Sequence, residues 1–343
     1  MTDTAGRTED GVEARQLLAS PALFLHGMDF DAGAASLTPM TEDSYARSVA
    51  LDGRIEAAGA ERRIGLDALD RAVIAPRPGR RSLHFIFHKG YCGATLLSQL
   101  LGAVDGLFAL REPPPLDLLG REARRLGAAG ALTPERWRWA NTVNLQMMAR
   151  SWRDEDYAVV TAPPSCNQIM PGLVGWTPQC RAILLYAEPE PFIAGLMGED
   201  RQAREAADME ALYYADFRAI VGDEAPALAE MGPARRAAMV WLAHGHAFRT
   251  MTADPAYEGR LLPVDFDVFL GAPAQALSQI CTFLGKPVDA AAAESVTGEA
   301  GMMDGPSGPG ARRAELDSLR AAHRAEIDDA LRMLAPWIDR LGF

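Results

Sequence analysis

The stretch FIFHKGYCGATLLSQLL, from Phe85 to Leu101, passes from an apolar run through two glycines into a helical pattern. The apolar run predicts a buried strand over 82–87, and the leucines after Gly93 have the spacing of a helix face that packs on a sheet, over 93–101. A glycine loop at the start of a helix turns several N–H groups toward one point, which suits a phosphate. The stretch therefore predicts a phosphate-binding loop. A tight strand-to-helix turn without a ligand is the alternative.

Further strands and helices alternate along the chain. Short apolar runs predict strands at 107–110, 157–161, 182–186 and 260–264. Helical patterns predict helices at 133–152, 192–221, 233–253 and 273–284. This alternation predicts an α/β fold, a three-layer P-loop-type domain with a mainly parallel sheet. Ligands of such sheets bind at the carboxyl ends of the strands, so we expect the site in the loops at 88–95, 111–115, 161–168 and 187–191.

The segments around this core predict an N-terminal extension and a C-terminal helix. Apolar runs between 22 and 39 predict a hairpin, and Thr41 can cap a helix over 42–58. Prolines and glycines predict a linker over 66–81 and a loop over 300–310, with a final helix at 312–341. We therefore divide the chain into a flexible tail (1–20), a hairpin and helix extension (21–80), the core (81–290), and a loop with the C-terminal helix (291–343).

The composition narrows the classes of partner. The formal net charge is -12 and 23% of the residues are charged. Nucleic acids and anionic membranes are bound through Lys and Arg, so this acidic chain predicts neither as a partner. No apolar run is as long as a membrane span, and the polar start of the sequence does not read as a signal peptide, so we expect a cytoplasmic protein. The four cysteines form no C-x-x-C pair; Cys166, Cys180 and Cys281 are predicted to be buried, reduced thiols, whereas Cys92 belongs to the glycine loop.

The glycine loop departs from the common nucleotide-binding form. In G-x-x-x-x-G-K-[ST], counted from Gly90, the sixth residue would be Gly, whereas here it is Thr95. The Ser or Thr that ligates magnesium is also missing from its place, so a magnesium-dependent ATPase or GTPase is disfavoured and no metal is expected. Lys89, one of only two lysines in the chain, can add a full positive charge beside the loop.

Three stretches together resemble the sulfotransferase family, in particular a bacterial subgroup. Cys92–Leu97 (CGATLL) resembles the family's S-G-T/S-T-x-L loop, and Leu110–Pro113 (LREP) resembles the acid and proline that follow the second strand in bacterial members. The segments VDFDVFL (264–270) and ICTFLGKP (280–287) resemble its C-terminal signature. The resemblance covers most of residues 20–290. It implies that the loop binds the 5′-phosphosulfate of PAPS (3′-phosphoadenosine 5′-phosphosulfate) as co-substrate, through Lys89, Gly90, Tyr91, Cys92, Gly93, Ala94 and Thr95.

The resemblance also implies catalytic roles. Glu112 would act as the general base that removes the acceptor's proton, as a carboxylate near the loop can do; an ion pair with Arg111 is the alternative role. Lys89 would stabilise charge on the bridging oxygen during transfer, against the alternative of a solvated loop cation.

The chain departs from the family at three ligand positions. Tyr91 stands where a cation usually precedes the loop, and Ala187 and Gly195 stand where the family carries the Arg and Ser that bind the 3′-phosphate. Either another arginine such as Arg181 or Arg201 replaces them, or the donor is not PAPS, or the site is not catalytic.

Together these features predict an enzyme that transfers a sulfuryl group from PAPS to a hydroxyl or amine of a small molecule or glycan. A P-loop enzyme resembling small-molecule kinases and a non-catalytic member that binds a ligand or partner are the alternatives. No signature in the sequence identifies the acceptor or the oligomeric state.

Overall fold

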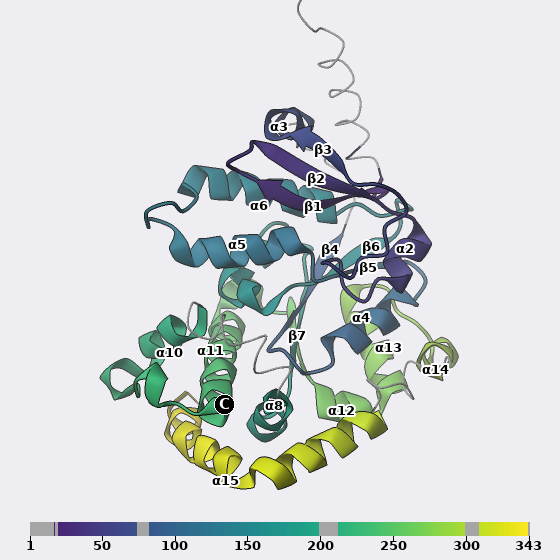
Figure 1. Cartoon of the computed structure of the whole chain (residues 1–343). Helices are drawn as coiled ribbons and strands as arrows, with labels where there is room; N and C mark the ends of the chain where they lie inside the picture. The colour runs from purple at the N-terminus through teal and green to yellow at the C-terminus, as the bar shows by residue number, and fades with distance from the viewer. Residues whose placement is uncertain (1–16, 18–19, 74–81, 199–211, 299–308, 342–343) are drawn as a thin grey trace, which may run out of the picture. The chain divides into compact units, whose positions relative to one another are not determined.

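A computed structural model of the chain describes residues 17, 20–73, 82–198, 212–298 and 309–341 (Figure 1). Several expectations fall wholly or partly outside these ranges: most of the tail, the second half of the 66–81 segment, the middle of the 192–221 helix and most of the 300–310 loop. The described residues form two compact units, one within residues 17–86 and 98–182 and the other within residues 87–97 and 183–341.

The core is a five-stranded parallel sheet, which confirms the predicted fold class. Its strands are β4 (Leu83–His88), β5 (Leu107–Arg111), β6 (Tyr157–Thr161), β7 (Ala182–Tyr186) and β8 (Leu261–Asp265), in the order β5-β6-β4-β7-β8. All six residues of β4 are buried, as expected for a central strand of a parallel sheet whose two faces are covered. In the register, Phe85 of β4 and Leu110 of β5 both face Val160 of β6.

A smaller antiparallel sheet precedes the core. It consists of β1 (Leu23–Asp29), β2 (Ala34–Pro39) and β3 (Arg62–Gly65), in that order. The first two strands are the predicted hairpin, with an irregularity in the register between Leu25 and Gly27. The third strand was not predicted from the sequence.

The helix predicted over 42–58 is much shorter than expected. The structure ends α2 (Glu42–Arg47) where Ser48 turns into extended backbone. The chain then bends so that Leu51 is buried and its N–H donates to the carbonyl of Arg111 at 2.8 Å. This backbone bond replaces the next helical turns.

The first half of the predicted linker is also helical, as α3 (Leu66–Val73). Leu66 and Leu69 are buried, so their helical spacing outweighs the prolines that follow at 76 and 78.

The other helices of the first unit follow the sheet strands. They are α5 (Pro114–Arg125), α6 (Pro134–Met148) and α7 (Met170–Val174), with a short turn of 3₁₀ helix at Pro164–Ile169. Thr133 caps α6 by accepting from the N–H of Arg136, as its sequence predicts. The α5 helix was not predicted: its prolines occupy the first turn, where a missing N–H costs no hydrogen bond.

The second unit is mainly helical around β7 and β8. Its helices are α8 (Pro189–Leu196), α10 (Tyr214–Val221), α11 (Pro233–Ala253), α12 (Phe266–Gly271), α13 (Pro273–Leu284), α14 (Ala290–Gly298) and α15 (Pro309–Leu341). The helix α4 (Ala94–Gly102) begins in this unit. The long α15, yellow in Figure 1, packs against α8 and α11 and departs from helical geometry at His323.

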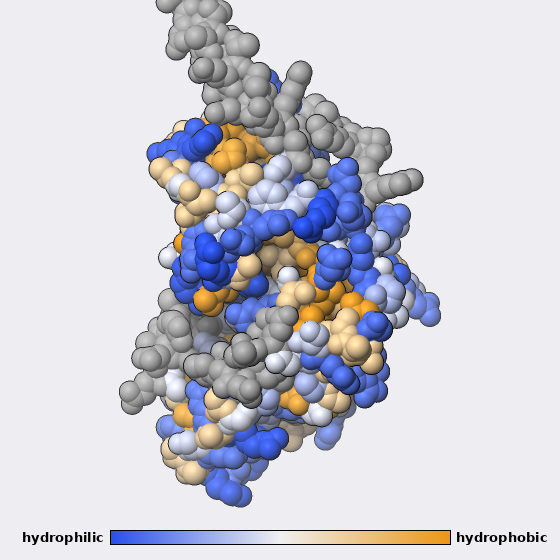
Figure 2. Space-filling model, turned by 90° about the vertical axis from the view of Figure 1, so that its right-hand side faces the viewer, coloured by the Kyte–Doolittle hydropathy of each residue, from blue (hydrophilic) through white to orange (hydrophobic). Residues whose placement is uncertain are grey.

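The surface of the molecule is varied in polarity. On the face drawn in Figure 2, hydrophilic residues predominate and the hydrophobic ones form smaller patches between them. Among the helices of the described ranges, none combines the length and apolarity that crossing a membrane would require.

Candidate functional site

The glycine loop connects the end of β4 to the start of α4 and has unusual backbone geometry. Gly90 has a φ of 90°, Tyr91 of 49° and Gly93 of 74°. Glycine adopts such left-handed conformations readily, whereas a residue with a side chain rarely does. The structure thus confirms the strand–loop–helix arrangement and adds a strained residue, Tyr91, at its centre.

The start of α4 offers donors to an anion. The N–H of Leu97 bonds to the carbonyl of Gly93 at 3.0 Å, so the N–H groups of the first helical residues have no acceptor within the helix. Thr95 is exposed in this first turn and can add its hydroxyl. The N–H of Gly90, in contrast, already donates to Nδ1 of His88 at 3.1 Å.

Lys89 is buried, with 5% of its surface exposed, so it is not the solvated loop cation of the alternative interpretation. Its ammonium lies 3.7 Å from the ring centre of Trp241 and 5.6 Å from that of Tyr186. Burial lowers the pKa of Lys89 to about 7, and the nearby Cys92 and Glu188 oppose this shift. The side chain can therefore gain or lose its charge near neutral pH.

Trp241 is a part of this site that the sequence did not reveal. Its indole Nε1 donates to the carbonyl of Ala187 at 2.9 Å, and this bond fixes the ring face on which the Lys89 ammonium lies. In the sequence, Trp241 has only the pattern of a core or pocket-wall residue on α11.

The positions that the family uses for the 3′-phosphate provide no ligand here. Ala187 is fully buried and Gly195 lies buried inside α8. Of the two nearby acids, Glu190 forms an ion pair with Arg320 of α15 at 3.0 Å, whereas Glu188 is exposed close to Lys89. Neither Ala187 nor Gly195 therefore places a polar side chain where the resemblance expects the ligands of a 3′-phosphate.

Of the two arginines proposed as replacements, the one that the structure describes does not fill this gap. Arg181 precedes β7, at the amino end of this strand, whereas ligands of parallel sheets bind at the carboxyl ends. Arg201 lies outside the described residues.

Two other helices of the second unit hold the glycine loop. Arg312 of α15 donates from Nη1 to the carbonyl of Tyr91 at 2.8 Å, and its Nε lies 3.5 Å from the carboxylate of Asp267 on α12. The ring of Phe266, also on α12, fills the space that a side chain at Gly93 would need. We name Phe266, Asp267 and Arg312 the loop clamp.

Glu112 follows β5 in the first unit and also has left-handed backbone geometry, with a φ of 48°. Its N–H donates to the carbonyl of Thr161 at 2.9 Å, and its side chain is half-buried. A non-glycine residue in this conformation is strained, and strained residues are common at functional sites. This geometry agrees with a functional role for Glu112 without testing it.

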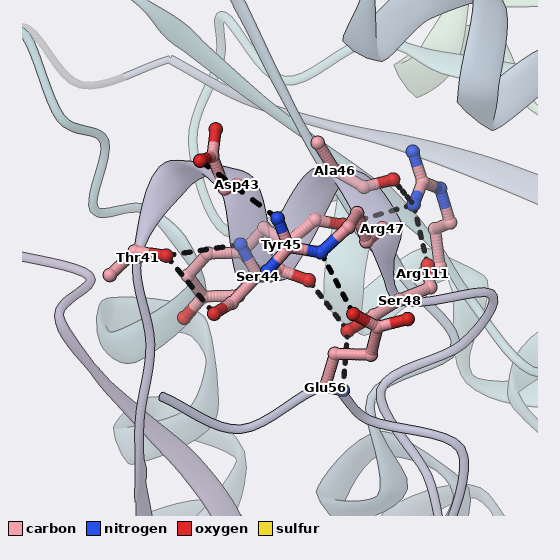
Figure 3. Close-up of polar contacts among 9 residues, drawn as sticks. All are labelled: Thr41, Asp43, Ser44, Tyr45, Ala46, Arg47, Ser48, Glu56 and Arg111. Atoms are coloured by element: carbon pink, nitrogen blue, oxygen red, sulfur yellow. Dashed lines mark hydrogen bonds and ion pairs between the residues drawn. The ribbon is translucent and has the colours of Figure 1, made fainter. Parts of the chain in front are cut away.

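Glu112 and Arg111 do not form the ion pair that the alternative role requires. Arg111 instead donates from Nη1 to three carbonyls at the end of α2, those of Tyr45 (3.0 Å), Ala46 (3.1 Å) and Ser48 (2.6 Å) (Figure 3). The guanidinium thus neutralises the negative end of the helix and has a structural role.

In the described part of the chain, neither the cysteines nor the His, Asp and Glu residues form a disulfide or a metal-type cluster. All four cysteines are free and buried, as predicted for Cys166, Cys180 and Cys281. The thiol of Cys92 donates to the carbonyl of Leu185 at 3.4 Å. Within the ranges that the structure describes, no group of three or more His, Cys, Asp or Glu residues is arranged to hold a metal ion.

Comparisons with known proteins find matches among solved structures. No protein-family model matches the sequence, and no curated protein matches it. Among solved structures, the sulfotransferase domain of the Synechococcus olefin synthase is 17% identical with a TM-score of 0.40, covering 76% of this chain and 97% of that domain. The sulfotransferase domain from the curacin biosynthetic pathway is 16% identical (TM-score 0.39; 66% and 81% covered). A sulfotransferase from Mycobacterium avium is 13% identical (TM-score 0.41; 78% of each chain covered). The chain is thus similar in structure to sulfotransferase domains at low sequence identity.

Proposed function

We propose that the protein transfers a sulfuryl group from PAPS to a hydroxyl or amine of a small molecule or glycan. The observation that carries the proposal is the glycine loop, whose left-handed residues lead into the first turn of α4, where the N–H groups have no acceptor within the helix. Such a loop suits phosphate oxygens, and the CGATLL sequence favours a phosphosulfate over a nucleoside triphosphate with magnesium.

In this proposal the residues after β4 hold the transferred group. The N–H groups of Cys92 to Thr95 and the Thr95 hydroxyl would bind the 5′-phosphosulfate oxygens. Lys89, when protonated, would stabilise the negative charge that develops on the bridging oxygen as the S–O bond to the phosphate breaks. An anion bound close to Lys89 would favour its charged form.

The residue after β5 would activate the acceptor. As the acceptor oxygen or nitrogen forms its bond to sulfur, it must lose a proton, and the carboxylate of Glu112 would take it. PAP (3′-phosphoadenosine 5′-phosphate) would leave with the electrons of the broken bond.

A second candidate is a P-loop enzyme that uses another phosphorylated donor, such as a small-molecule kinase. The observation that favours it is the pair Ala187 and Gly195, which gives a 3′-phosphate no ligand. A nucleotide without that phosphate would lose nothing at these positions.

Turnover tests the catalytic part of the proposal. We expect sulfur-labelled PAPS, incubated with a panel of phenols, alcohols, sugars and amines, to label at least one acceptor class. Glu112→Gln should reduce this turnover by about 10² to 10⁴, the usual contribution of a general base, while PAP binding stays unchanged. Unchanged turnover in Glu112→Gln would exclude this residue as the base. Transfer of phosphate from ATP, with none of sulfate from PAPS, would favour the kinase.

A further inference from the structure

The peptide between Tyr91 and Cys92 has an orientation set from outside the loop. The Tyr91 carbonyl points at Arg312, whose Nη1 donates to it at 2.8 Å across 221 residues of sequence. The described residues contain no cis peptide, and in a trans peptide the C=O and the following N–H point in opposite directions. The N–H of Cys92, a proposed phosphate donor, therefore points away from Arg312.

This orientation has a cost that the loop clamp offsets. Tyr91 has a φ of 49°, and a residue with a side chain holds such a conformation only when its surroundings fix it. Turning this peptide over would rotate ψ of Tyr91 and φ of Cys92, and the glycines at 90 and 93 leave the backbone on either side of these two residues without a side chain to restrict it. The loop sequence by itself therefore does not fix the direction of the Cys92 N–H.

The guanidinium of Arg312 is itself held in place. Its side chain is 14% exposed, its Nε lies 3.5 Å from a carboxylate oxygen of Asp267, and its Cζ lies 5.0 Å from the ring centre of Phe266. The same Phe266 ring occupies the space beside Gly93. One cluster thus contacts the loop at Tyr91 and at Gly93, immediately before and after Cys92.

We propose that Arg312 is a positioning residue that holds the Tyr91–Cys92 peptide in the orientation required for phosphate binding, so that α15 controls the affinity of the glycine loop. This inference rests on the proposed phosphate-binding role of the loop. It assigns to the C-terminal helix a function in the site, although α15 lies far from the loop in sequence.

The test compares Arg312→Met and Arg312→Lys with Arg313→Met, which removes an exposed arginine from the next position of the same helix. Titration calorimetry with PAP and with inorganic pyrophosphate gives Kd. We expect Arg312→Met to weaken both ligands about tenfold, Arg312→Lys to recover part of the loss by keeping a cationic donor, and Arg313→Met to bind like the wild type.

Hydrogen exchange of residues 90–93 in the ligand-free protein separates this inference from the proposed function. Arg312→Met should increase exchange in this loop several-fold, with a smaller increase for Asp267→Asn, while exchange in the buried β4 stays as in the wild type. Wild-type exchange and wild-type Kd in Arg312→Met would overturn the inference. Binding of neither ligand by the wild-type protein would overturn the phosphate role, whereas the exchange result would still decide whether Arg312 holds the loop.

Discussion

At the scale of single residues, Lys89 is the group whose chemistry depends most on its surroundings. Its side chain is removed from water and lies on the face of Trp241, and burial lowers its pKa to about 7 from an ordinary 10.5. Protonation of Lys89 is therefore less favourable in the folded state, where the side chain is buried, than in the unfolded state, where it is in water. An anion at the loop would reduce this cost, so binding and proton uptake should be coupled.

The stability of Lys89→Met should reveal this cost. Between pH 7 and about 10.5 the unfolded wild type binds more protons at this residue than the folded one, so this contribution makes the free energy of unfolding rise with pH. We expect Lys89→Met to be more stable than the wild type by up to a few kcal/mol at pH 7 and below, with the difference shrinking toward pH 10. Chemical denaturation across this range measures it, with Lys286→Met as the control for a lost lysine. A difference that does not change with pH would contradict the account.

Gly93 and Gly90 form a matched pair for testing the loop geometry. Both have left-handed backbone, but a side chain at Gly93 would collide with the Phe266 ring, whereas nothing lies within 4 Å of one at Gly90. We expect Gly90→Ala to cost about 1–2 kcal/mol of stability from backbone strain alone. Gly93→Ala should cost about 1–3 kcal/mol more from overpacking, and Phe266→Ala in the same chain should recover part of that excess. Equal costs for the two alanines, measured by urea unfolding, would show that the ring does not restrict the loop.

At the scale of elements, Arg111 joins α2 to the end of β5. Arg111 is 6% exposed, and its Nη1 donates to three carbonyls at the end of α2 that have no intrahelical partner. Arg111→Met should therefore lower the free energy of unfolding by about 3 kcal/mol. Arg111→Lys should lower it by less, because lysine keeps the positive charge, although it lacks the planar guanidinium. Urea denaturation gives both values; a loss below about 0.5 kcal/mol in Arg111→Met would mean that the three bonds contribute little to stability.

The elements that the sequence predicted best are those with a strong local signal. The strand at 157–161, the helix at 233–253 and the helix at 273–284 have the predicted bounds, because apolar runs, a first-turn proline or a terminal glycine mark their ends. The prediction of a helix over 42–58 was wrong from Ser48 onward, since the bond from Leu51 to Arg111 depends on a strand about 60 residues further along. No local pattern contains that information.

At the scale of the whole molecule, the sequence predicted the sheet and the glycine loop but only part of the site. The loop could be predicted because strand, glycines and helix are contiguous between Phe85 and Leu101. Trp241 and Arg312 could not, because each reaches the loop region from a helix more than a hundred residues away and has an ordinary helical context in the sequence. The roles of Glu112 and Lys89 in transfer stay predictions.

The most direct test of the central claim, that the glycine loop binds the 5′-phosphosulfate of PAPS, is thermal unfolding with PAP in the absence of magnesium, compared with ATP and magnesium. A ligand that binds only the folded state adds about 2.7 kcal/mol of stability at a hundred times its Kd. We predict that PAP alone raises Tm and that ATP with magnesium does not. A rise with ATP and magnesium but none with PAP, or no rise with either, would contradict the claim.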